Sequence, residues 1–102
     1  MADIKRLREA LVRRILEGAG RASPSERRAA FENSGLPGAV GVLVDKVAAR
    51  AYAVSEEDFH GAISLGLSED QVFEMVVCAA VGQASQQYEA AMAALEAASG
   101  KK

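Results

Sequence analysis

The chain has 102 residues, of which half are hydrophobic and a quarter are charged, with a formal net charge of −2. These values are ordinary for a globular protein of one domain, so we treat residues 1–102 as a single domain. The single cysteine excludes an intramolecular disulfide, and no Cys/His cluster has the spacing of a zinc site. We therefore expect neither a bound metal nor another cofactor.

The apolar segments of the chain bear on its location. The first segment, residues 1–18, is basic but has no uninterrupted apolar stretch, so it does not resemble a secretory signal peptide. The longest apolar run, from Val72 to Ala84, is too short to span a membrane and contains Glu74. We therefore expect a cytoplasmic protein without a membrane partner.

Two helices are expected in the N-terminal third. Apolar residues recur at spacings of three and four over residues 4–16, and Gly18 ends the pattern. The motif Ser23-Pro24-Ser25-Glu26 is typical of a helix start, with a serine cap, a proline in the first turn and a glutamate three residues after the cap. This second helix is expected to end soon after Phe31. Residues 1–35 are thus interpreted as a basic helical extension.

Three more helices are expected after it. One runs from about Gly38 to Val54, a short one starts at Ser55-Glu56-Glu57-Asp58, and the longest starts at Ser68-Glu69-Asp70-Gln71 and reaches about Ala98. In its first half, apolar residues face nearly every direction, which favours burial in the domain or in an oligomer. No segment alternates like a strand. The sequence predicts an all-α bundle of about five helices with a long buried C-terminal helix.

The segment GLSEDQVFEMVVCAAVGQASQQYEAAMAAL carries a family resemblance. A Gly-Leu-Ser-Glu-Asp connector precedes an apolar helix with Phe-Glu and an Ala-Ala-x-Gly step. This order resembles the alkylhydroperoxidase D-like, or carboxymuconolactone decarboxylase-like, family, over about residues 36–96. The resemblance implies a helical bundle whose family-like core covers residues 36–98, and it implies assembly into dimers, trimers or hexamers.

The redox motif of that family is missing. Redox members carry Cys-x-x-Cys ahead of the connector and a histidine four residues after the second cysteine. By the resemblance, the cysteine positions fall on Ala51 and Val54 and the histidine position falls on Asp58. Alanine and valine provide neither an attacking thiolate nor a resolving partner, so we expect no thiol peroxidase activity.

The remaining candidates for proton transfer are His60, Asp58 and Glu57. The only histidine, His60, could act as an acid or base, because imidazole is suited to proton transfer at physiological pH, although a lone histidine is more often a surface residue. Asp58 and Glu57 lie with Glu56 in the first turn of a helix, where acids interact favourably with the helix dipole. Cys78 lies among valines and alanines, which is typical of a small core residue with a raised pKa.

The charge distribution and the apolar stripe suggest that the first helix packs on the bundle or across an oligomer interface. Residues 1–28 hold eight basic and four acidic residues, whereas the remainder holds four basic and ten acidic residues. A basic first helix could therefore dock on the acidic surface of a neighbouring subunit or partner. Its arginines alternate with acids and lack interleaved aromatics, which disfavours nucleic-acid binding. Alanine-rich helices bury little area each, which also favours a homo-oligomer.

Three functions follow as expectations. The first is a non-redox member of this fold that acts as an oligomeric binding or accessory module for a small apolar ligand or another protein. The second is an acid/base enzyme of the carboxymuconolactone decarboxylase kind, using His60 and the Glu56–Asp58 cluster. The third is a purely structural homo-oligomer.

Overall fold

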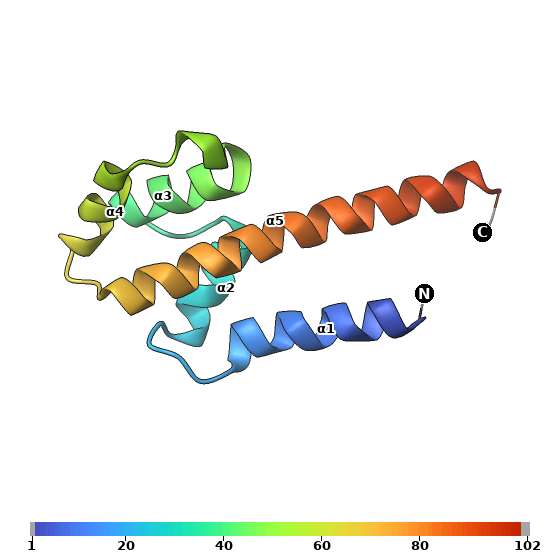
Figure 1. Cartoon of the computed structure of the whole chain (residues 1–102), viewed down its shortest axis with the longest axis horizontal. Helices are drawn as coiled ribbons and strands as arrows, with labels where there is room; N and C mark the ends of the chain where they lie inside the picture. Colours follow the sequence, from blue (N-terminus) through green and yellow to red (C-terminus); the bar gives the residue numbers. More distant parts are fainter. Residues whose placement is uncertain (1, 101–102) are drawn as a thin grey trace.

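The computed structural model describes residues 2–100, and within this range the chain forms only helices (Figure 1). The α-helices are α1 (Ala2–Glu17), α2 (Pro24–Glu32), α3 (Gly38–Ala49), α4 (Glu56–Ile63) and α5 (Glu69–Ala98), with a 3₁₀ turn at Ala51–Ala53. The predicted all-α bundle of five helices is confirmed.

Serine caps start α2 and α5, as the sequence predicts. The Ser23 hydroxyl accepts a hydrogen bond of 3.1 Å from the Glu26 N–H, and the Glu26 carboxylate accepts one of 2.9 Å from the Ser23 N–H. Ser68 and Gln71 repeat this exchange at 3.1 and 2.9 Å. Each pair provides partners for backbone N–H groups at a helix start, which have none within the helix.

The predicted third helix is too long by about five residues. Instead of continuing to Val54, α3 ends at Ala49, and Arg50 leaves the helical conformation with φ −149° and ψ 59°. The 3₁₀ turn follows, and then α4 folds back on α3, where Lys46 binds Asp58 and Gly61 lies against Ala39. A continuous helix would carry the chain away from these contacts, so tertiary packing overrides the local apolar pattern.

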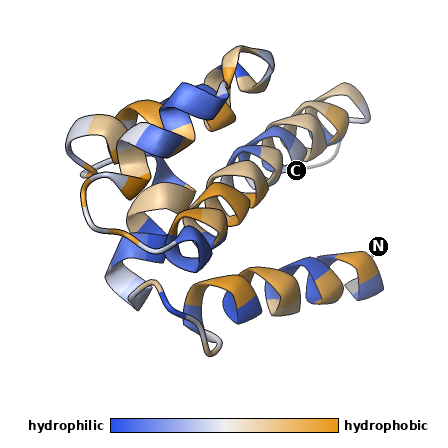
Figure 2. Ribbon diagram, turned by 60° about the vertical axis from the view of Figure 1, so that its left-hand side comes forward, coloured by the Kyte–Doolittle hydropathy of each residue, from blue (hydrophilic) through white to orange (hydrophobic). Residues whose placement is uncertain are grey.

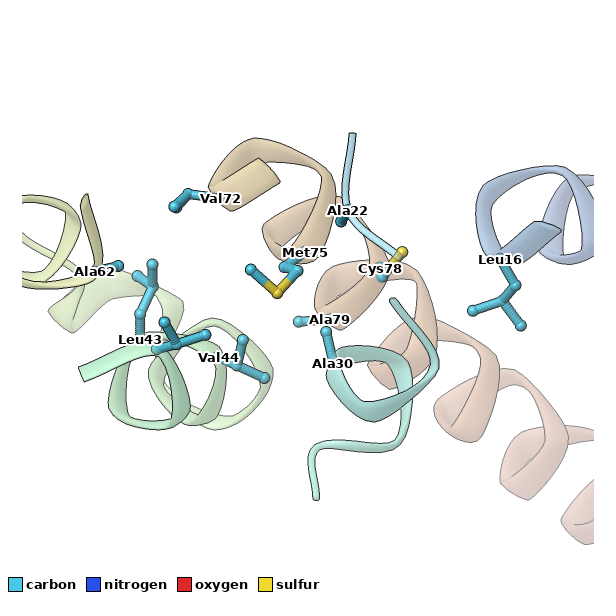
Figure 3. Packing of buried hydrophobic residues seen from close by; sticks show 11 residues of the cluster. Leu16, Ala22, Ala30, Leu43, Val44, Ala62, Val72, Met75, Cys78 and Ala79 are labelled. Atoms are coloured by element: carbon cyan, nitrogen blue, oxygen red, sulfur yellow. The ribbon is translucent and has the colours of Figure 1, made fainter. Parts of the chain in front are cut away.

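The hydrophobic core surrounds the first half of α5 (Figure 3). Met75 and Cys78 of α5, together with Leu43 and Val44 of α3, are the largest fully buried side chains among the described residues. On the side of α2, Ala30 is fully buried and the backbones approach closely at Gly82. A β-carbon built on Gly82 would lie 2.0 Å from the Phe31 carbonyl oxygen, so only glycine allows this crossing.

The second half of α5 projects from this core. All buried residues of α5 lie between Val72 and Ser85, so the prediction of a buried C-terminal helix holds only for its first half. The remaining 13 residues, 86–98, extend beside α1, which runs in the opposite direction (Figure 1). The longest dimension of the molecule, 51 Å, follows α5. None of the helices within residues 2–100 is long and apolar enough to cross a membrane.

Candidate functional site

Asp58 is held in a local network at the start of α4. Its carboxylate lies 3.1 Å from Nζ of Lys46 in α3 and accepts hydrogen bonds from the N–H of Ser55 at 2.9 Å and from the Ser55 hydroxyl at 3.2 Å. The Ser55 backbone N–H, followed by the Lys46 ammonium, lowers the pKa of Asp58. Asp58 is therefore an anion at neutral pH, with an evident structural role in joining α3 to α4.

His60 and Glu57 lie elsewhere on α4. Both side chains are exposed, and His60 lines a surface groove together with Phe59, Ile63, Glu69, Asp70, Val72 and Phe73. Neither Asp58 nor Glu57 lines that groove. The structure therefore does not bring the three predicted proton carriers into one cavity, and a reaction there would rely on His60 with the two acids at the start of α5.

The two positions that the resemblance matches to the family's cysteines, Ala51 and Val54, lie at the turn after α3. Ala51 is exposed in the 3₁₀ turn, and Val54 packs at the edge of the hydrophobic core. Over residues 2–100, no three His, Cys, Asp or Glu side chains are placed to hold a metal ion.

Glu74 fixes the loop between α1 and α2 against α5. Its two carboxylate oxygens accept hydrogen bonds from the N–H groups of Arg21, at 3.0 Å, and Ala22, at 2.7 Å. These two bonds, with a smaller contribution from the Arg27 charge, lower the pKa of Glu74. The loop approaches closely because Gly20 has no side chain: a β-carbon there would lie 2.8 Å from the carboxylate.

Arg27 is buried in α2 and holds the end of α1. Its Nη1 donates hydrogen bonds to the carbonyls of Gly18, at 2.7 Å, and Ile15, at 3.2 Å. The last carbonyls of a helix carry partial negative charge and have no partners within it, so a buried guanidinium suits this place. Its Nε is also buried and has no hydrogen-bond partner.

A groove of about 420 Å³ opens between α1 and α5, beside this arginine. Apolar side chains of Leu11, Ile15, Phe73 and Val77 line it, and Cys78 lies at its base. The cysteine is 1% exposed, its thiol contacts the Ile15 carbonyl at 3.6 Å, and burial raises its pKa. The thiol is thus neutral at physiological pH, and the groove offers an apolar surface and not a nucleophile.

The same side of the molecule carries two exposed apolar strips, which we call the α1–α5 face. On α1 the strip is formed by Ile4, Leu7 and Leu11, and on α5 by Phe73, Ala80, Ala84, Ala91 and Leu95, with the partly buried Val77 between Phe73 and Ala80. Spacings of three, four and seven place each set on one side of its helix. Leu7 is 70% and Phe73 66% exposed, and each belongs to a strip of apolar neighbours, so the exposed side chains form a patch.

The α1–α5 face is held together at its outer end by Arg8. The guanidinium of Arg8 lies 3.5 Å from the Glu89 carboxylate and 5.0 Å from the centre of the Tyr88 ring, so it pairs with both an anion and an aromatic face of α5. Apolar and hydrophilic residues alternate along α1 (Figure 2), with Val12 and Leu16 packed towards the core. The strip at Ile4, Leu7 and Leu11 is therefore a second apolar surface on the same helix.

Sequence patterns did not locate this face. The available signal was that apolar residues from Val72 to Val81 face nearly every direction around α5. This pattern does not indicate which side of α5 another helix of the same chain will cover. Arg27 gave no signal at all, because one arginine in a charged segment resembles its exposed neighbours.

Comparison with known proteins adds no further guide: the chain matches no protein-family model, no curated protein and no solved structure. The alkylhydroperoxidase D-like resemblance therefore remains a prediction.

Proposed function

We propose that the protein is a non-redox helical module of the alkylhydroperoxidase D-like kind, which works in the cytoplasm as a homo-oligomeric binding or accessory protein. The observation that carries this proposal is the α1–α5 face, where large apolar side chains on two helices remain exposed in the single chain. Contiguous apolar patches of this kind mark association or ligand sites.

The exposed area of the single chain supports assembly. A compact monomer of 10.7 kDa has an accessible surface of about 5,500 Å², whereas this chain exposes 6750 Å². Its radius of gyration, 15.4 Å, likewise exceeds the value of about 13 Å for a compact chain of this length. The excess area is greater than the roughly 800 Å² that each partner buries in an interface of standard size.

Assembly would also complete a binding site. The groove beside Cys78 is open towards the α1–α5 face, so a second copy on that face would enclose it. The side chains of Leu11, Ile15, Phe73 and Val77 suit a small apolar ligand. Three charged residues also line the groove: Glu74 and Arg27 are engaged by backbone groups, and Arg14 is exposed to solvent.

Native mass spectrometry of the untreated protein at low micromolar concentration tests the proposal. We expect a discrete oligomer, and an added non-protein mass would give the mass of a bound ligand to be identified. Leu7→Glu should convert the oligomer to a helical monomer, because it places a charge in the centre of the α1 strip. Arg13→Gln, which changes the net charge by the same amount at an exposed position on the opposite side of α1, should assemble normally.

Two results would contradict the proposal. One is a wild-type protein that stays monomeric up to tens of micromolar. The other is equal assembly of the Leu7→Glu and Arg13→Gln variants, which would show that the α1–α5 face is not the contact.

A further inference from the structure

We infer that two copies pair through the α1–α5 face with α1 of each copy packed antiparallel on α5 of the other. This inference rests on the proposed self-association and specifies its arrangement: a four-helix interface in which unlike helices meet. The occupant of the face is thus a second copy of this chain.

Symmetry restricts the ways in which the face can meet itself. In one copy, α1 and α5 lie side by side and run in opposite directions. A two-fold axis parallel to the helices places α1 of one copy over α5 of the other. A two-fold axis across the helices places α1 over α1 and α5 over α5. In both cases the same patch of each copy forms the interface, as two-fold dimers require.

Charge favours the pairing of unlike helices. The five acidic residues of α5 are Glu69, Asp70, Glu74, Glu89 and Glu96, and this helix has no lysine or arginine. In α1, five basic residues outnumber three acidic ones. Two α5 helices side by side would bring together two helices of negative charge only, whereas α1 on α5 brings opposite net charges together.

The shapes of the two strips lead to the same pairing. The α1 strip consists of large residues, Ile4, Leu7 and Leu11, whereas the middle of the α5 strip consists of Ala80, Ala84 and Ala91. Close packing is achieved when large side chains face small ones across an interface. Pairing α5 with α5 would instead place alanine against alanine, and pairing α1 with α1 would place leucine against leucine.

The contacts within one copy indicate the register. Arg8 lies beside Tyr88 and Glu89, so these residues of α1 and α5 are at the same height along the helix axes. Rotation about an axis parallel to the helices leaves positions along that axis unchanged. Leu11 of one copy should therefore lie near Ala84 of the other, and Leu7 near Ala91.

Cross-linking between two different single-cysteine chains tests the arrangement. Both chains carry Cys78→Ala; one also carries Leu11→Cys and the other Ala84→Cys, each at an exposed position. The chains are mixed in equal amounts, allowed to exchange subunits and treated with a short bis-maleimide. The three covalent dimers differ in mass, and using separate chains excludes cross-links within one chain. The pair Leu7→Cys and Ala91→Cys provides an independent repeat.

Random pairing would make the mixed dimer half of the product. We expect the mixed dimer to exceed either like pair several-fold in both experiments. Like pairs in excess, or the random proportions, would overturn the arrangement. Native mass spectrometry of the same samples separates the two failures: a monomer contradicts the proposed self-association, whereas an oligomer with like-pair cross-links contradicts only the pairing of α1 with α5.

Discussion

Replacing Gly82 with alanine is the most direct test of the crossing of α2 and α5. The added β-carbon would lie 2.0 Å from the carbonyl oxygen and 2.8 Å from the carbonyl carbon of Phe31. Both are backbone atoms of α2, so no side-chain rotation can relieve the contact, and the helices must separate by about 1 Å or more to reach a normal van der Waals distance.

Two opposing effects set the magnitude. Alanine favours a helix over glycine by about 1 kcal/mol, which would stabilise the variant. Separation of the helices loosens the packing of Ala30 and Ala79, which are 0% and 1% exposed, and overpacking of this kind costs about 1–3 kcal/mol. Because the clash is with backbone, we expect the upper part of this range and a net loss of about 1–2 kcal/mol in the free energy of unfolding.

Urea unfolding followed by circular dichroism at one fixed protein concentration measures the effect. Ala90→Gly is the matched control, because residue 90 is exposed in the projecting half of α5 and reports helix propensity alone. We expect both variants to be less stable than wild type. If Gly82→Ala were more stable than wild type, propensity alone would explain the result, and the close approach at Phe31 would be refuted.

Three further predictions concern the charged and sulfur-containing side chains. Glu74→Gln should destabilise the protein by about 1–2 kcal/mol at pH 7, because one carboxylate oxygen that accepts a backbone N–H is lost. The folded-state pKa of Glu74 is lowered, so its contribution to the free energy of unfolding is present above the unfolded-state pKa and is lost as the pH falls through the folded-state pKa. Urea titrations should therefore show a smaller difference in stability between the variant and wild type at pH 3 than at pH 7. An unchanged difference would contradict the anchoring role of Glu74. Asp58→Asn should also lower stability at pH 7, with the same disappearance in acid and a smaller effect in high salt, and a salt-independent effect would argue against the pair with Lys46. Cys78 should react with a thiol reagent only when the protein opens, whereas rapid labelling of the native protein would show that the thiol is reachable from the groove.

Helix starts could be predicted from the sequence because their determinants are local. The capping pairs at Ser23 and Ser68 each involve residues three positions apart, and both form as predicted. The end of α3 could not be predicted in this way. The apolar pattern continues to Val54, but the helix stops at Ala49 because α4 returns to bind Lys46 through Asp58.

The Phe-Glu pair and the glycine step, on which the family resemblance depends, have separate structural roles here. Glu74 holds the α1–α2 loop, and Gly82 admits the end of α2. Phe73, by contrast, points away from the core and is 66% exposed. A pattern of residue types could indicate that all three matter for packing, but not that one of them faces outward.

This difference within α5 explains why the fold could be predicted more completely than the site. Helix propensity, capping and apolar spacing decide where α5 begins and ends, and those signals are contained within its own residues. Which side of α5 remains uncovered depends on where α1 and α2 pack. That placement depends on Arg27, which holds the end of α1, and on Glu74, which binds the backbone of Ala22, 52 residues earlier in the chain. The apolar residues on the uncovered side cost solubility unless something covers them. Their arrangement along a helix with only acidic charges, beside a basic helix with larger side chains, fits a second copy of the same pair of helices.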